Sequence, residues 1–199
     1  MPNFISSLAR RPSLVVAAAV AVTALLGGTA YAGSQTAEQA AASSAAAKAP
    51  QVKLHMQPSS AQLAECFPHA ESTVTVDLTT DAIGKDRFRM VASGLKPRTD
   101  FTVFLIEKAG APFGAVEYIG DFTTDAHGKA SNTFNLIVEE AFAFNNETQV
   151  RQELNSVGFW FADPKDDDGC LGAASPVTQF DGDASAGVQM MNSGPDLLP

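Results

Sequence analysis

The fold class is decided by the stretch Ser72-Thr73-Val74-Thr75-Val76-Asp77-Leu78-Thr79, in which apolar and polar residues alternate without a break. Successive side chains of a β-strand point to opposite faces. The three apolar residues therefore share one face, and the threonines share the other with Asp77. This pattern predicts a strand with one buried and one solvated face.

Residues 87–95 repeat the alternation after a turn-like segment at residues 81–84. Their apolar side chains, beginning with Phe88, are expected to point inward, while Arg87 and Arg89 point to solvent. Two such strands joined by a short turn predict a β-hairpin.

A second hairpin is expected around the turn Thr124-Asp125-Ala126-His127-Gly128, whose Asp and Gly suit a tight reversal. Residues 116–123 and 129–138 flank this turn and supply its two strands. Residues 101–106 are apolar at nearly every position, which is typical of a strand covered on both faces.

The most aromatic strand is predicted at Val157-Gly158-Phe159-Trp160-Phe161, with weaker strands at residues 177–180 and 187–191. Residues 139–155 have no clear period and are left unassigned. Many short strands with Gly and Pro turns, and no persistent helical period, indicate an all-β fold. We predict an antiparallel, immunoglobulin-like β-sandwich of about seven or eight strands.

The first 32 residues have the features of a secretory signal peptide. Arg10 and Arg11 precede an uncharged apolar run at residues 14–26, and Ala30-Tyr31-Ala32 forms an A-x-A cleavage site. The run is shorter than the roughly 20 residues that span a bilayer, so no membrane span is expected after cleavage. We therefore predict a secreted protein, extracellular or loosely associated with the cell wall.

The rest of the chain is predicted to form a spacer and one domain. Residues 33–64 are rich in Ala, Ser and Gln and poor in large apolar residues, which predicts a disordered or partly helical spacer. A single β-sandwich domain is expected at residues 65–194, followed by a short tail at residues 195–199.

The chain is acidic, with 22 Asp and Glu against 13 Lys and Arg, a net charge of −9. Loss of residues 1–32 would remove two arginines and no acid, and would take the net charge to −11. From Glu139 onward, 11 acids face only Arg151 and Lys165. Nucleic acid and anionic lipid need basic patches. We therefore expect an extracellular glycan, protein or cation as the partner, and no nucleic acid.

Cys66 and Cys170 are the only cysteines of the chain. In an exported protein they predict a disulfide, which would fasten the acidic stretch before Cys170 to the start of the domain. Two free thiols or an intermolecular bridge are the alternatives.

That acidic stretch is Asp163-Pro164-Lys165-Asp166-Asp167-Asp168-Gly169-Cys170, and we call it the acidic run. Its carboxylates are of the kind that bind Ca²⁺, which takes about six to eight oxygen ligands. The helix-loop-helix calcium pattern is not matched, because Pro164 stands at its first position and Ser175 at its twelfth. A weak calcium site and a solvated acidic loop both stay open. The candidate ligands are Asp163, Asp166, Asp168, Asp181 and Asp183.

Trp160, the only tryptophan, lies between Phe159 and Phe161 on the predicted aromatic strand. On a strand its side chain points to the opposite face from those of its two neighbours, so either Trp160 or the phenylalanine pair faces outward. An exposed aromatic ring beside an acidic loop suits contact with a sugar or a peptide. Trp160 is therefore a candidate ligand-binding residue, with burial in the core as the alternative.

No motif of a known reaction is present in the sequence. The three histidines lack zinc or copper spacing, and there is no G-x-S-x-G elbow. Glu139 and Glu140 are adjacent, so on a strand they point to opposite faces. We expect no catalytic residues, and a secreted hydrolase that uses carboxylates of the acidic C-terminal third is the alternative.

The stretch Ser93-Gly94-Leu95-Lys96-Pro97-Arg98-Thr99-Asp100-Phe101-Thr102-Val103 resembles the G-L-x-P-x-T-x-Y-x-V corner of fibronectin type III and related immunoglobulin-like domains. Phe101 stands where those families have a tyrosine. Together with residues 118–122, 159–164 and 180–183, this corner is similar to a group of secreted actinobacterial proteins without an assigned function. The resemblance implies a β-sandwich fold and an extracellular location, and no reaction.

These features predict a secreted, non-catalytic β-sandwich module for extracellular binding or surface association. Calcium is the only cofactor that the sequence suggests.

Overall fold

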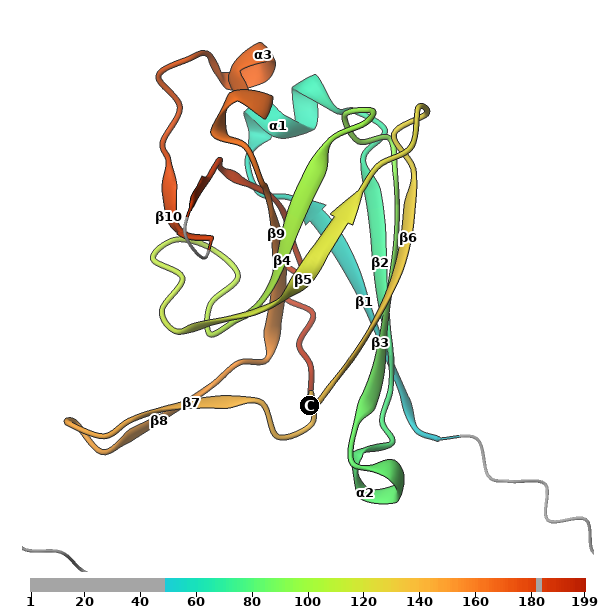
Figure 1. Cartoon of the computed structure of the whole chain (residues 1–199), viewed down its shortest axis with the longest axis vertical. Helices are drawn as coiled ribbons and strands as arrows, with labels where there is room; N and C mark the ends of the chain where they lie inside the picture. Colours follow the sequence, from blue (N-terminus) through green and yellow to red (C-terminus); the bar gives the residue numbers. More distant parts are fainter. Residues whose placement is uncertain (1–48, 182–183) are drawn as a thin grey trace, which may run out of the picture. The chain divides into compact units, whose positions relative to one another are not determined.

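The structure, a computed structural model, describes residues 49–181 and 184–199 (Figure 1). The predicted signal peptide and the first part of the predicted spacer lie outside these residues. In chain order the described elements are β1 (Gln51–Pro58), α1 (Ala61–Cys66), β2 (Glu71–Asp77), α2 (Thr80–Ile83), β3 (Asp86–Ser93), β4 (Asp100–Ile106), β5 (Val116–Thr123), β6 (Ala130–Leu136), β7 (Phe142–Asn145), β8 (Val150–Glu153), β9 (Ser156–Phe161), the 3-10 helix η1 (Pro164–Asp166), α3 (Asp168–Leu171), β10 (Thr178–Asp181), β11 (Ala184–Ala186) and β12 (Gln189–Asn192).

Eight of these strands form one antiparallel sheet in the order β5-β4-β9-β12-β1-β2-β3-β6. Strand β1 joins the two halves of this sheet, because residues 51–56 pair with β2 whereas Gln57 and Pro58 pair with β12. The two halves enclose a common apolar core. The predicted fold class, an antiparallel β-sandwich of about seven or eight strands, is confirmed.

The core forms where the alternating sequence places apolar residues inside. Val74 and Val76 of β2, and Phe88, Met90 and Ala92 of β3, are all buried, as the pattern predicted. Burial of one such large side chain contributes about 1.5–3 kcal/mol. The polar residues between them remain on the opposite face of the sheet.

Strands β4 and β9 are buried on both faces, which explains why their sequences are almost continuously apolar. One face of each strand, with Phe101 and Phe159, belongs to the main core. The other face, with Phe104 and Trp160, packs against Phe113 in a second cluster.

The predicted hairpin of β2 and β3 is confirmed, but the predicted hairpin of β5 and β6 is wrong. Strand β5 pairs with β4 and strand β6 pairs with β3, so the two strands lie at opposite ends of the strand order. The tight turn predicted at residues 124–128 is present, because the N–H of Asp125 donates to the carbonyl of Lys129 at 2.8 Å, but Thr124 at its start also bonds the segment before β4. The Thr124 hydroxyl accepts the N–H of Thr99 at 3.0 Å and donates to the carbonyl of Lys96 at 2.6 Å. The connection is thereby fastened to the segment before β4.

The folded domain begins before the predicted boundary at residue 65, since β1 and α1 both lie within the predicted spacer. The signal for β1 is an alternation of Val52, Leu54 and Met56 with polar residues. This alternation is short and stands in a region dominated by Ala, Ser and Gln, so the average composition concealed it.

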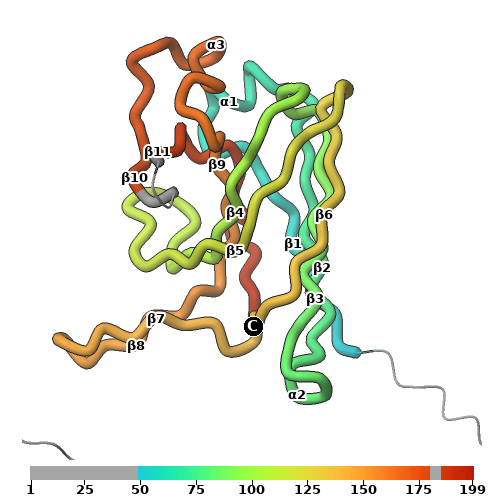
Figure 2. The backbone as a smooth tube through the Cα atoms, in the orientation of Figure 1, coloured from blue at the N-terminus to red at the C-terminus, as the bar shows by residue number. Residues whose placement is uncertain are grey.

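Two further segments differ from their predicted form. The unassigned residues 139–155 contain the hairpin of β7 and β8, which pair with each other and with no other described strand. This hairpin stands off from the main sheet (Figure 2). The predicted tail packs on the domain, because Leu198 is 3% exposed and its N–H donates to the carbonyl of Asn155 at 2.7 Å. None of the described helices is long and apolar enough to cross a bilayer.

Candidate functional site

The predicted disulfide between Cys66 and Cys170 is present, with Cα atoms 5.9 Å apart. It joins the last residue of α1 to α3, across a sequence separation of 104 residues. The acidic run is therefore fastened to the N-terminal part of the domain. Closing so long a loop restricts the unfolded chain and contributes about 2–4 kcal/mol.

The predicted calcium ligands of the acidic run engage separate partners. Asp163 caps η1 by accepting the N–H of Lys165 at 2.9 Å. Asp166 forms an ion pair with Lys96, with 2.7 Å between the nitrogen and the oxygen. Asp168 lies in the first turn of α3. Among the described residues, no group of three His, Cys, Asp or Glu side chains is placed to hold a metal ion.

The other two predicted calcium ligands lie at the limit of the described chain. The backbone of Asp181 ends β10, but its side chain and all of Asp183 lie outside the described residues. A calcium site that includes them therefore stays a prediction.

Asp167, which was not among the five predicted calcium ligands, is the fully buried carboxylate of the run. One of its oxygens accepts the N–H of Val188 at 2.9 Å, and the other accepts the hydroxyl of Ser175. A buried carboxylate needs such donors, because desolvation would otherwise penalise its charge. We assign Asp167 a structural role in fixing the segments around α3 and before β12.

The prediction that Trp160 or its neighbours face outward is wrong, because Trp160, Phe159 and Phe161 are all fully buried. The Trp160 ring makes edge-to-face contacts with Phe104 and Phe113, at centroid distances of 5.4 and 5.0 Å. The loop that carries Phe113, together with β11, covers the face of β9 that the sequence left open. Trp160 is a core residue and contacts no exposed ligand surface.

One polar surface of the described chain consists of the outward-pointing residues of β1, β2, β3 and β6. We call it the outer face. All of its residues are exposed or half-buried. The strand register aligns them in three rows: Gln51, Asp77, Arg87 and Asn135; Lys53, Thr75, Arg89 and Thr133; His55, Thr73, Val91 and Ser131.

Lys53, Arg87 and Arg89 give the outer face a positive charge. All three are exposed, and none forms an ion pair with another residue of the described chain. Two carboxylates lie on the same face: Asp77, which accepts a hydrogen bond from the amide of Gln51 at 2.6 Å, and the exposed Glu71 at the other end of β2. Arg87 and Arg89 are roughly 7 Å apart along their strand, and Lys53 lies two strands from Arg89, roughly 10 Å away. The cations therefore form a patch that several charged groups of one polymer could contact.

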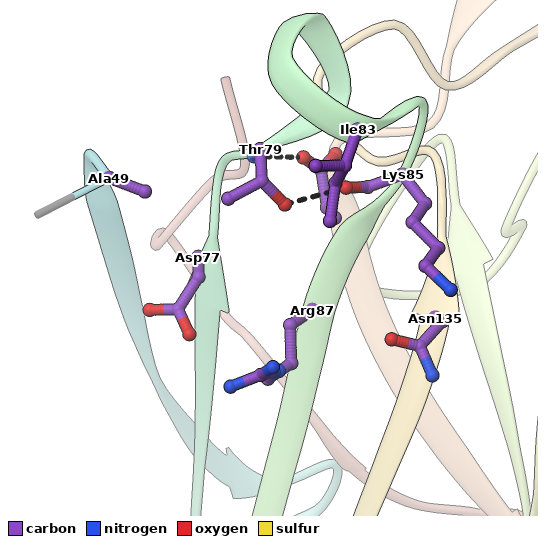
Figure 3. A pocket seen from close by; sticks show the side chains of 8 residues that line it. Ala49, Asp77, Thr79, Ile83, Lys85, Arg87 and Asn135 are labelled. Atoms are coloured by element: carbon purple, nitrogen blue, oxygen red, sulfur yellow. Dashed lines mark hydrogen bonds between the residues drawn. The ribbon is translucent and has the colours of Figure 1, made fainter. Parts of the chain in front are cut away.

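A pocket of about 340 Å³ opens at one end of the outer face. Figure 3 shows Lys85 extending toward Asn135 and Arg87 extending toward Asp77, all of which line this pocket. Lys85 thus adds a fourth cation, and the Asn135 amide adds a neutral donor. Among these side chains Lys85, Arg87 and the Asn135 amide can donate to an anionic group such as a phosphate or a carboxylate, whereas the carboxylates of Asp77 and Asp86 line the same pocket.

Asp86 also lines this pocket, but it is 1% exposed and serves the fold. One oxygen accepts the N–H groups of Thr79 and Thr80 at 2.7 and 2.9 Å, and the other accepts those of Val138 and Glu139 at 2.8 and 3.3 Å. Desolvation by burial raises the pKa of this carboxyl, but the hydrogen bonds outweigh it and hold the pKa below its usual value of 3.8. Asp86 therefore stays ionised at neutral pH and fixes the backbone around the pocket.

A second pocket, of about 330 Å³, lies beside the acidic run. Leu63, Phe113, Leu171 and Val188 make its walls largely apolar. No charged side chain of the described residues lines it.

No protein-family model matches this chain, and no curated protein or solved structure matches it either. The function must therefore be argued from the site. From the sequence, Arg87 and Arg89 could be recognised as facing solvent, but Lys53 could not be added to them because its strand was assigned to the spacer.

Proposed function

We propose that the protein is a secreted, non-catalytic binding module that associates with an anionic extracellular polymer through its outer face. The observation that carries this proposal is the set of Lys53, Arg87 and Arg89. These exposed cations lie on neighbouring rows of one sheet surface, without an ion-pair partner among the described residues. The pocket with Lys85 continues the patch at its end.

The net charge of −9 does not oppose this binding, because the charges are segregated along the chain. Half of the acidic residues lie from Glu139 onward, whereas the outer face carries the two carboxylates of Glu71 and Asp77 against Lys53, Arg87 and Arg89. At physiological ionic strength charges are screened over about 8 Å, so the local surface decides which groups are attracted. The acidic composition predicted a neutral glycan, a cation or a basic surface as partner. The local charge of the outer face leads us to propose instead a polymer that carries phosphate or carboxylate groups.

The extracellular location rests on the signal-peptide features of residues 1–32 and is supported by the disulfide of Cys66 and Cys170. Disulfides persist in oxidising compartments outside the cytosol. The hydrolase alternative gains no support from the acidic run, because Asp166 is paired with Lys96 and Asp167 is buried against Val188.

Binding to immobilised polymers tests this proposal. We expect the protein to bind polyphosphate or alginate, which carry phosphate and carboxylate groups respectively, and not to bind neutral dextran. The variant K53Q/R87Q/R89Q is expected to bind about tenfold or more weakly, because a protein with fewer cations releases fewer counterions from the polymer when it binds.

The matched control is K108Q/R151Q/K165Q, which makes the same change in net charge at exposed positions outside the outer face. This control is expected to bind like the wild type. Equal losses in the two triple variants, or equal binding to dextran, would contradict the proposal.

A further inference from the structure

The hairpin of β7 and β8 carries an aromatic surface that the domain leaves uncovered. The strand register sets Phe142 opposite Glu153 and Phe144 opposite Arg151, so these four side chains share one face, which we call the hairpin face. Phe142 and Phe144 are each 45% exposed. Large apolar side chains grouped on an exposed surface mark an interaction site.

The hairpin face points away from the domain because the opposite face is the one that packs. Ala143 and Gln152 on that opposite face are half-buried, and Ala143 contacts the main core, whereas Val150 near the tip of the hairpin is 48% exposed. At the base of the hairpin, the N–H of Leu154 donates to the carbonyl of Ala141 at 3.0 Å, and Leu154 is buried. The domain thus anchors the hairpin at its base and leaves Phe142 and Phe144 to solvent.

The strands of the hairpin also have open edges. Within the described chain β7 and β8 pair only with each other, so each retains one edge with unpaired backbone groups. A hairpin of two strands is marginally stable in water, and a third strand would strengthen it. An extended peptide can add such a strand, with its backbone bonded to the edge and alternate side chains on the exposed face.

The charge around the hairpin selects the kind of partner. Residues 139–153 contain four glutamates and one basic residue, Arg151, which gives them a net charge of −3. The glutamates are Glu139, Glu140, Glu147 and Glu153. Arg151 is itself engaged, since it bonds Glu153 at 2.6 Å and lies 4.0 Å from the centroid of the Phe142 ring. A second copy of the chain that docked through its own hairpin would bring the same negative charge and be repelled, whereas a basic segment would be attracted.

We propose that the hairpin face docks an extended, basic polypeptide segment. Apolar side chains of the segment cover Phe142 and Phe144, its lysines or arginines face the glutamates, and its backbone extends the sheet of the hairpin. This docking site shares no residue with the outer face, so it is independent of the anionic polymer proposed there.

Selection of random dodecapeptides displayed on phage tests this proposal on the whole exported protein. The enriched peptides are expected to carry net positive charge and alternating apolar residues. As synthetic peptides, they are expected to bind the wild type about tenfold more tightly than F142T/F144T, because the aromatic anchors of a peptide site carry most of its affinity. Threonine keeps the strand propensity of both positions.

Three further variants make the outcome specific. Val177→Thr removes an equally exposed apolar side chain elsewhere and is expected to bind like the wild type. F142Y/F144Y keeps the rings and is expected to retain binding. E139Q/E140Q/E147Q leaves the aromatic face intact and is expected to weaken binding about threefold to tenfold, less so at high salt.

Neutral or acidic enriched peptides would overturn the proposal, as would equal affinity for F142T/F144T or a selection without enrichment. A dimer that forms in sedimentation experiments and is lost in F142T/F144T would assign the hairpin face to a second copy of the chain, and would overturn it too.

Discussion

The carboxylate of Asp167 accepts the backbone N–H of Val188 at 2.9 Å, across a sequence separation of 21 residues. The same fully buried side chain accepts the hydroxyl of Ser175. The acidic run thus contains one residue that holds the C-terminal segment on the domain, among neighbours that face solvent or a cation. Three carboxylates of the acidic run thus have a role in the local structure: Asp163 caps η1, Asp166 pairs with Lys96 and Asp167 bonds Val188.

We expect Asp167→Asn to lower the free energy of unfolding by about 1–3 kcal/mol. Asparagine keeps one oxygen that can accept a hydrogen bond. Its NH₂ group replaces the other oxygen and cannot accept the hydrogen bond that this oxygen receives from Val188 or Ser175 in the wild type. Urea unfolding followed by circular dichroism measures the change. Asp163→Asn is the matched control and is expected to be near neutral, since asparagine also caps helices and Asp163 is exposed. Equal stability of Asp167→Asn and the wild type would contradict the structural role.

The lowered pKa of Asp86 predicts how the free energy of unfolding depends on pH. The folded pKa of Asp86 lies below the usual 3.8, so its contribution is complete above that value and is lost as the pH falls through the lower folded pKa. Asp86→Asn should therefore cost about 1–3 kcal/mol at neutral pH, with the difference from the wild type closing in acid. Unfolding free energies measured across this pH range check the prediction, and a difference that stays constant with pH would contradict it.

Removal of the disulfide should destabilise the protein without changing its fold. The variant C66S/C170S is expected to lose about 2–4 kcal/mol in unfolding free energy, because its unfolded chain is no longer restricted. Mass analysis without reductant should find the wild type lacking the hydrogens of both thiols. Two thiols that react with an alkylating agent before reduction would contradict the intramolecular bridge.

Tryptophan fluorescence reports the burial of Trp160. We expect a blue-shifted emission that resists quenching by acrylamide and does not respond to added sugars, because the ring is fully buried against Phe104 and Phe113. Phe113→Ala should expose the indole and increase its quenching, whereas Phe142→Thr should leave it unchanged. A red-shifted emission in the wild type would contradict the structure at this position.

The fold was predictable where one face of a strand is buried and the other is solvated. The alternation at Val74 and Val76 and the apolar run of β4 both located strands that the structure contains. Pairing between distant strands was not predictable in the same way. The turn at residues 124–128 forms as its local sequence predicts. Thr124 also bonds Thr99 and Lys96 before β4, and a local pattern does not reveal such contacts.

The site was harder to predict because it depends on register. Arg87 and Arg89 could be assigned to a solvated face from their own strand, but their relation to Lys53 requires the pairing of β1 with β2 and of β2 with β3. Trp160 was misassigned for a related reason. The loop with Phe113 that covers it has no periodic pattern, so the sequence did not indicate that both faces of β9 are buried.

The central claim is that the outer face binds an anionic polymer, and its most direct test is a map of amide chemical shifts during titration with polyphosphate. We predict that the largest changes lie on β1, β2, β3 and β6 around Lys53, Arg87 and Arg89, and that R87Q/R89Q reduces them at the same polyphosphate concentration. Changes concentrated on the β7–β8 hairpin or beside the acidic run, or no changes at all, would contradict the account.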